Sequence, residues 1–196
     1  MPSEPLVLGF DTSAAHCAAA LVSGDQVIGH HVKEMSRGQA EYLMPMLEGL
    51  LAEAGKDWKD LNAIGVGIGP GNFTGIRISV SAARGLALAL DIPAVGVSTF
   101  EATAFGHAAP WCVAVAAPRD RAYVQTSDPS SVPELVEGPV MSDMPTLSPP
   151  AAPVLVANIA HIAALKRAAQ YVRPAPLYVR AADAAPPRDP APKILP

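Results

Sequence analysis

Short runs of hydrophobic residues divide the first half of the chain into strands that are separated by turn residues. Strands are predicted at 5–11, 16–23, 25–34, 61–69 and 94–98. Gly24 and Asp25 stand between the second and third of these runs and predict a tight hairpin. Two further strands are predicted at 111–117 and 121–127, after a change in composition.

Apolar residues at helical spacing predict three helices in the same part of the chain. They cover 39–54, 74–90 and a segment that begins at Thr99, whose hydroxyl is assigned as the cap. The resulting order, three strands followed by alternating helices and strands, fits neither a Rossmann unit nor a barrel. It fits a ribonuclease-H-like α/β lobe, in which parallel strands extend an antiparallel three-strand meander and helices cover the faces.

The distribution of glycine and proline predicts two lobes. Every glycine except Gly138 precedes residue 110, whereas sixteen of the twenty-one prolines lie at or after it. We therefore expect a first lobe at 1–109 and a small second lobe at 110–183. Within the second lobe, 128–153 is rich in proline and lacks periodicity, which predicts a loop. Residues 184–196 are expected to form an extended tail.

Charge and cysteine content limit the classes of function. The 196 residues carry a net charge of −4 without a block of Lys or Arg, so the chain alone is not expected to bind tRNA or DNA. Cys17 and Cys112 form no CxxC motif, which predicts reduced thiols in the cytoplasm. The first apolar run lacks the basic residues of a signal peptide, and no run reaches the ~18 residues of a membrane span. Membrane association is therefore not expected.

Two of the predicted helices have compositions that indicate a partner surface. On helix 39–54 the apolar residues fill an arc of about 200° around the axis, whereas one sheet covers ~100°. Helix 74–90 consists largely of small residues, and its only charges, Arg77 and Arg84, share one face. Packing against a partner explains both patterns, but burial within its own lobe explains the second helix equally well. The predicted interface residues are Tyr42, Met44, Met46, Leu51, Arg77, Ser81, Arg84 and Gly85.

The glycine-rich stretch GVGIGPGNFTGIRI at 65–78 raises the question of phosphate binding. It lacks the Lys-Ser or Lys-Thr of a P-loop, and Asn72 or Thr74 replaces the third glycine of a GxGxxG motif. We interpret the glycines as positions where a strand passes close to helices, with Pro70 and Gly71 forming a turn. Asn72 or Thr74 then caps the following helix.

The sequence FDTS at 10–13 is a second candidate for phosphate binding. An Asp at the end of a first strand, followed by hydroxyl residues, is typical of actin-like ATPases, where the carboxylate holds a metal-bound water. Asp11, Thr12 and Ser13 are therefore interpreted as a vestigial phosphate loop or as a capped turn. The second lobe lacks a glycine-rich loop, no histidine pair has metal-ligand spacing, and no GxSxG motif occurs. We expect neither catalysis nor a bound metal.

Four segments together resemble the bacterial TsaB (YeaZ) family: FDTS, GIGPGNFTGIRI, ARGLALALDIPAVGVSTFEA and PLYVR. The resemblance covers most of 5–127 and resumes at 154–183. It implies an actin-like ATPase (ASKHA) fold with a shortened second lobe, related to that of TsaD. It also implies a non-catalytic, cytoplasmic subunit that pairs with a TsaD-like protein and a TsaE-like ATPase. Such a complex makes threonylcarbamoyladenosine (t6A) beside the tRNA anticodon, so tRNA is contacted only through the complex.

The segment AAPRDRAYV at 116–124 departs from the family, because Ala116 and Pro118 stand where a charged pair is common, although Tyr123 is kept. Gln39 stands where the family often has His. These differences argue against a ligand site in the second lobe. The alternative to a scaffold subunit is an autonomous ATPase, kinase or glycopeptidase of the same fold, or a generic nucleotide-binding module. We expect no cofactor of its own, and leave open ATP or ADP at the partner interface and a homodimer of the free chain.

Overall fold

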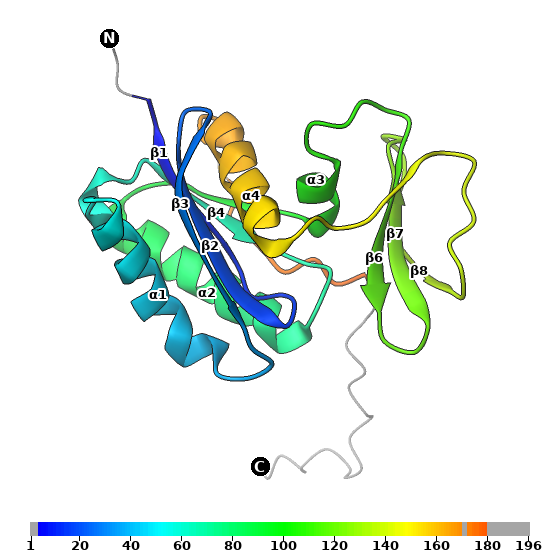
Figure 1. Cartoon of the computed structure of the whole chain (residues 1–196). Helices are drawn as coiled ribbons and strands as arrows, with labels where there is room; N and C mark the ends of the chain where they lie inside the picture. Colours follow the sequence, from blue (N-terminus) through cyan, green and yellow to red (C-terminus); the bar gives the residue numbers. More distant parts are fainter. Residues whose placement is uncertain (1–3, 170–171, 180–196) are drawn as a thin grey trace, which may run out of the picture.

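The computed structural model describes residues 4–169 and 172–179, so the predicted tail at 184–196 lies outside the described residues (Figure 1). The first lobe contains a five-stranded sheet in the order β3-β2-β1-β4-β5. Its strands are β1 (Leu6–Asp11), β2 (His16–Ser23), β3 (Gln26–Glu34), β4 (Ala63–Gly67) and β5 (Ala94–Val97). The first three pair in antiparallel fashion, and β4 and β5 continue the sheet in parallel from β1. The predicted ribonuclease-H-like plan is confirmed.

Two helices cover one face of this sheet. The helix α1 (Gln39–Glu53) packs on β2 and β3, and α2 (Phe73–Leu90) packs on β4. A short 3₁₀ helix, η1 (Trp58–Asp60), lies between α1 and β4 in the chain. Apolar side chains of both long helices share one hydrophobic core with the sheet. Asn72 caps α2, because its side-chain oxygen accepts a hydrogen bond from the backbone N–H of Gly75 at 2.8 Å.

The opposite face of the sheet is covered by a helix that was not predicted from the sequence. The helix α4 (Ala152–Lys166) packs across β1, β2 and β4 (Figure 1). Glycines permit this close packing, since a Cβ at Gly9 would lie 2.6 Å from the carbonyl oxygen of Val156. Apolar residues occur on all sides of α4, so no polar face marked its helical period. Residues 152–166, which were assigned to the second lobe, therefore belong to the core of the first.

The second lobe is built on a four-stranded sheet in the order β8-β7-β6-β9. Its strands are β6 (Cys112–Ala117), β7 (Arg121–Thr126), β8 (Glu134–Glu137) and β9 (Thr146–Leu147). Both β8 and β9 lie within 128–153, so the prediction that this whole segment is a loop was wrong. These strands are too short to produce a hydrophobic period, and pairing with β7 and β6 orders them.

The helix α3 (Thr99–Ala104) connects the two lobes, because it contacts both α4 and β6. Its cap is Ser98 and not Thr99 as predicted: the Ser98 hydroxyl accepts from the Glu101 N–H at 3.1 Å, and the Glu101 carboxylate accepts from the Ser98 N–H at 3.0 Å. The Thr99 hydroxyl instead donates to the carbonyl oxygen of Pro70. Glu101 also forms an ion pair with Lys166 at the end of α4.

Candidate functional site

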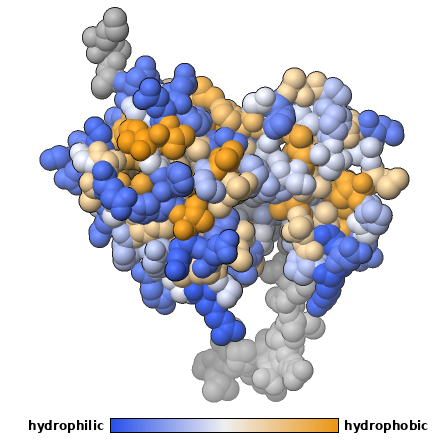
Figure 2. Space-filling model, in the orientation of Figure 1, coloured by the Kyte–Doolittle hydropathy of each residue, from blue (hydrophilic) through white to orange (hydrophobic). Residues whose placement is uncertain are grey.

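A cleft between the two lobes contains the FDTS loop. Its cavity of about 690 Å³ is bounded by the loop after β1 and the start of α2 on one side and by β6 and β7 on the other. The polar residues that line it include Ser13, His16, Gln39, Asn72, Thr99 and Tyr123. Figure 2 shows a hollow between the two lobes. This is where an actin-like fold would hold a nucleotide, so the geometry of the loop decides what the cleft can bind.

Asp11 organises the loop from a buried position at the end of β1. Its Oδ2 accepts hydrogen bonds from the backbone N–H and the hydroxyl of Ser13, both at 3.0 Å, and lies 2.9 Å from Nε2 of His16. Its Oδ1 is buried and has no hydrogen-bond partner among the described residues. That oxygen lies against Gly67, where a Cβ would be only 2.0 Å away. His16 was not assigned to this site from the sequence, because only the hairpin between β1 and β2 brings it to Asp11.

Thr12 connects the FDTS loop to α2. Its hydroxyl is buried and donates a hydrogen bond to the carbonyl oxygen of Gly75 at 2.6 Å. The loop also lies close to Gly71, where a Cβ would be 2.3 Å from the carbonyl oxygen of Ser13. The FDTS and GPGNFTG motifs therefore meet in space. The interpretation of the strand glycines as packing positions is confirmed at Gly65, where a Cβ would lie 2.8 Å from the carbonyl oxygen of Ile159 on α4.

The hydrogen bonds of the loop limit its chemistry. The hydroxyls of Thr12 and Ser13, which were candidates to face phosphate, are both bonded within the protein. Ser13 and His16 bind the same oxygen of Asp11, so the histidine does not stand between the serine and the carboxylate as it does in a hydrolase triad. Among residues 4–169 and 172–179, no group of three or more His, Cys, Asp or Glu side chains could hold a metal ion.

Cys17 lies beside this loop but is not a reactive thiol. It is fully buried on β2, and Cys112 is buried in the second lobe, each as a free cysteine. Burial, and to a smaller extent the negative charge of Asp11, raises the pKa of the Cys17 thiol to about 12. Because the thiolate is the reactive form, Cys17 is inert near neutral pH.

The residues predicted on α1 divide into surface and core. Tyr42 is 40% exposed and Met44 is partly buried, but Met46 and Leu51 are buried in the core of the first lobe. The wide apolar arc of α1 is explained by its contacts with both the sheet and α2. The assignment of Met46 and Leu51 to an interface is therefore corrected. Figure 2 shows a mostly hydrophilic surface with scattered hydrophobic residues on this side of the first lobe.

The residues predicted on α2 all lie on its outer side. Leu88 shares this side, and its side chain is 84% exposed. A Cβ added to Gly85 would meet no atom within 4 Å. We define the α2 face as the exposed residues Phe73, Arg77, Ser81, Arg84, Gly85 and Leu88. By length and composition α2 resembles a membrane-spanning helix, but its other side packs on the sheet of the first lobe.

Three residues at the start of the α2 face form a stacked cluster that was missed from the sequence. The Arg77 guanidinium lies 3.8 Å from the centre of the Phe73 ring, and its Nε donates to the Tyr178 hydroxyl at 2.9 Å. The Phe73 and Tyr178 rings are 5.0 Å apart. Tyr178 belongs to the PLYVR motif, which was recognised in the sequence. The contact between Tyr178 and Arg77 was not evident, because 101 residues separate them in the chain.

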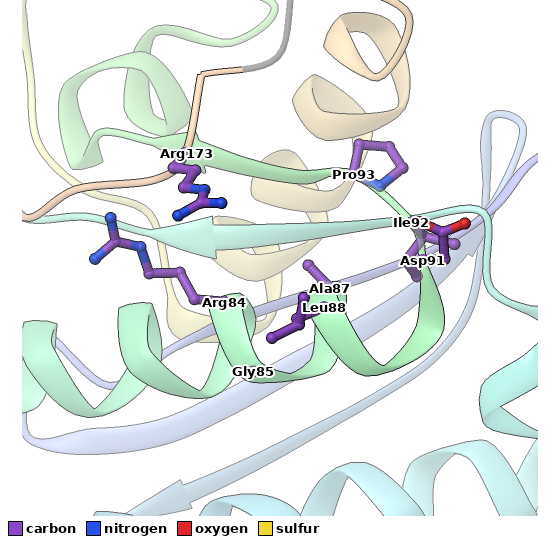
Figure 3. Close-up of a pocket in the computed structure, with 8 residues that line it drawn as sticks. All are labelled: Arg84, Gly85, Ala87, Leu88, Asp91, Ile92, Pro93 and Arg173. Atoms are coloured by element: carbon purple, nitrogen blue, oxygen red, sulfur yellow. The ribbon is translucent and has the colours of Figure 1, made fainter.

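A hollow of about 720 Å³ lies at the other end of the α2 face (Figure 3). Arg84 and Arg173 reach toward it from α2 and from the segment after α4, respectively. Leu88 and Ile92 contribute apolar surface, and Asp91 also lines the hollow. Arg173 was not predicted, because the course of residues 172–179 depends on the tertiary fold.

Sequence comparison identifies the family that this chain resembles. The model of the family described as TsaD, tRNA N6-adenosine threonylcarbamoyltransferase, matches residues 25–132. The tRNA threonylcarbamoyladenosine biosynthesis protein TsaB of Escherichia coli K12 is 37% identical over 100 residues, which are 51% of this chain and 43% of that protein. The TsaB protein of Bacillus subtilis 168 is 37% identical over 98 residues, 50% of this chain and 43% of that protein. The chain thus spans less than half the length of these curated relatives.

Structural comparison extends the similarity to both lobes. YeaZ from Pseudomonas aeruginosa superposes with a TM-score of 0.69 at 25% sequence identity, covering 89% of this chain and 99% of YeaZ. The second lobe therefore follows the same fold even though the sequence matches to the curated relatives cover only about half of the chain.

Proposed function

The chain belongs to the TsaB/YeaZ family, within the family of TsaD-type tRNA N6-adenosine threonylcarbamoyltransferases, and we propose that it is a non-catalytic subunit in t6A biosynthesis. It pairs with a TsaD-like protein, which carries out threonylcarbamoyl transfer, and works together with a TsaE-like ATPase. The names of the curated relatives support the pathway.

The α2 face is the observation that carries the proposal. Its exposed leucine and its unobstructed glycine, Leu88 and Gly85, lie one turn apart on a helix whose inner side is already packed. Small residues permit another helix to approach closely. Exposed apolar residues mark interaction sites when they form a continuous face. On the neighbouring helix α1, Tyr42 is exposed and Met44 is partly buried, so both remain candidates for contact with a partner.

The hydrogen bonding of the FDTS loop supports the absence of catalysis. Thr12 and Ser13 are bonded to Gly75 and Asp11, so neither hydroxyl is available to a phosphate without rearrangement. The Ser13 and His16 geometry likewise gives no support to a glycopeptidase. We expect no ATP hydrolysis by the purified chain. Steady hydrolysis that is lost in Asp11→Ala would instead favour an autonomous ATPase.

The charge of the chain supports contact with tRNA only through the complex. The net charge of −4 and the scattered cations give little affinity for phosphate. The cytoplasmic location is proposed from the pathway and from the two free cysteines. ATP or ADP at the interface with the partner, and a homodimer of the free chain, are secondary proposals.

Co-expression with the TsaD-like protein of the same organism, followed by size-exclusion chromatography, tests the proposal. We expect the two chains to elute together. Gly85→Leu should stay folded and weaken the complex, because a bulky side chain would keep the partner helix away. Ala108→Leu, in the exposed loop after α3, is the matched control and should leave the complex intact. Separate elution of the two wild-type proteins would contradict the proposed function.

A further inference from the structure

The segment 172–179 is held beside α2 at several points. The Leu177 N–H donates to the carbonyl oxygen of Ile68 at 2.8 Å. Pro174 packs on β5, since a Cβ at Gly96 would lie 3.2 Å from its Cβ. At the far end Tyr178 accepts the hydrogen bond from Arg77 described above. These contacts place residue 173 at one end of the α2 face and residue 178 at the other.

Two cations consequently meet in one hollow. Arg84 and Arg173 are both exposed and both line it (Figure 3). Neither side chain forms an ion pair within 4.0 Å in the described part of the chain, although Asp91 lines the same hollow. Arg77, by contrast, already has its guanidinium stacked and hydrogen-bonded. Two like charges that have no ion-pair partner among the described residues favour an anion between them, and guanidinium groups match the geometry of a carboxylate.

The rest of the hollow favours a protein side chain as that anion. Ala87, Leu88 and Ile92 supply apolar surface next to the two arginines. A phosphate backbone would leave this apolar surface without a partner, whereas an Asp or Glu on an apolar helix or loop would cover it. The exposed leucine and the arginines can then be buried together in one interface.

The charge of the α2 face does not favour a second copy of this chain as the occupant. A two-fold contact places the same patch of both copies together. The helix α2 contains no acidic residue, and among the described residues that line the hollow Asp91 is the only acidic one. Such a contact would bring Arg84 and Arg173 of the two copies together. Only Asp91 of each copy would be available to neutralise their positive charges.

We propose that Arg84 and Arg173 form a two-arginine pocket that binds an acidic side chain of the TsaD-like partner. This proposal rests on the proposed function and identifies a polar anchor within its interface. The hydrogen bond from Arg77 to Tyr178 anchors the segment that carries Arg173. The pocket combines residues 89 positions apart in the chain, so only the folded first lobe presents it.

Charge reversal in the full chain tests the pocket. Arg84→Glu and Arg173→Glu, singly and together, are compared with wild type by thermal unfolding and then by calorimetric titration with the purified TsaD-like protein. We expect each single reversal to weaken binding about tenfold or more at low salt. Raising the salt concentration should reduce the difference, because the interaction is between charges. Arg119→Glu, in the exposed turn between β6 and β7, is the matched control and should bind like wild type.

The possible outcomes separate this proposal from the proposed function. Wild-type affinity in the folded double variant overturns the pocket while the proposed function stands. Failure of the wild-type chain to bind the TsaD-like protein overturns both. Self-association of the free chain that the double variant abolishes, without a change in partner binding, assigns the pocket to a second copy and overturns the proposal. If a reversal unfolds the chain, Arg84→Gln and Arg173→Gln provide the same comparison without adding a negative charge.

Discussion

The hydroxyl of Thr12 donates a buried hydrogen bond to the carbonyl oxygen of Gly75, 2.6 Å away. This contact joins the loop after β1 to the first turn of α2, across 63 residues of sequence. The approach is so close that a Cβ on Gly75 would lie 1.9 Å from the carbonyl oxygen of Thr12. A hydroxyl that an actin-like ATPase would present to phosphate therefore stabilises the packing of the first lobe.

Gly75→Ala should destabilise the protein. The added methyl group must displace the backbone of Thr12, and overpacking of this kind typically lowers the free energy of unfolding by ~1–3 kcal/mol. Gly85→Ala is the matched control on the same helix, where nothing lies within 4 Å. It should raise the free energy of unfolding by ~0.5–1 kcal/mol, because alanine is the better helix former. Urea unfolding of both variants measures the difference. Equal effects would show that the close approach has no energetic importance.

Asp11→Ala should reduce the stability of the folded chain. Removal of the carboxylate leaves the Ser13 N–H and the His16 imidazole without their partner. A buried polar group that loses its partner typically lowers the free energy of unfolding by ~1–3 kcal/mol. Thermal unfolding tests this expectation. A variant as stable as wild type would contradict a structural role for the Asp11 carboxylate.

Met46→Ala and Tyr42→Ala distinguish core from surface on α1. Met46 is 5% exposed and Tyr42 is 40% exposed. Truncation of a buried methionine should lower the free energy of unfolding by ~2–5 kcal/mol. The free energy of unfolding of the tyrosine variant should stay within ~0.5 kcal/mol of wild type, as is usual for surface substitutions. Its affinity for the partner should be lower. The reverse order of stabilities would contradict the assignment of the two residues.

We expect Cys17 to make the folded protein less stable at high pH. Its pKa is raised to about 12 by burial and by Asp11, from an ordinary value of 9.0. Between these values the folded chain keeps a proton that the unfolded chain releases. The free energy of unfolding therefore falls as the pH rises from about 9 toward 12. Cys17→Ala removes this contribution, so the difference between variant and wild type should change across that window and stay constant below pH 8, roughly one unit under the unfolded pKa.

Alkylation gives a second measure of the same property. Iodoacetamide should leave Cys17 unmodified in the native protein at mildly alkaline pH and modify it after unfolding in urea. Rapid labelling of native Cys17 would contradict both its burial and the direction of its pKa shift.

Local pattern was sufficient to predict the strands of the first lobe and the two helices on one face of its sheet. The strands at 5–11, 16–23 and 25–34 and the helices at 39–54 and 74–90 have clear periods and turn residues at their ends, so their positions depend little on distant contacts. The same reasoning missed α4, whose apolar residues occur on all sides, and the edge strands β8 and β9, which are too short to show a period.

Tertiary structure decided which of the predicted residues work together. The sequence by itself determined a ribonuclease-H-like α/β lobe, its family and an α2 helix with a small-residue face, because these depend on composition and local order. It did not determine that Met46 is covered, that Thr12 bonds to Gly75, or that Arg173 stands near Arg84. Those relationships depend on how α1, α4 and residues 172–179 pack on one sheet, and contacts between such distant segments leave no period in the sequence.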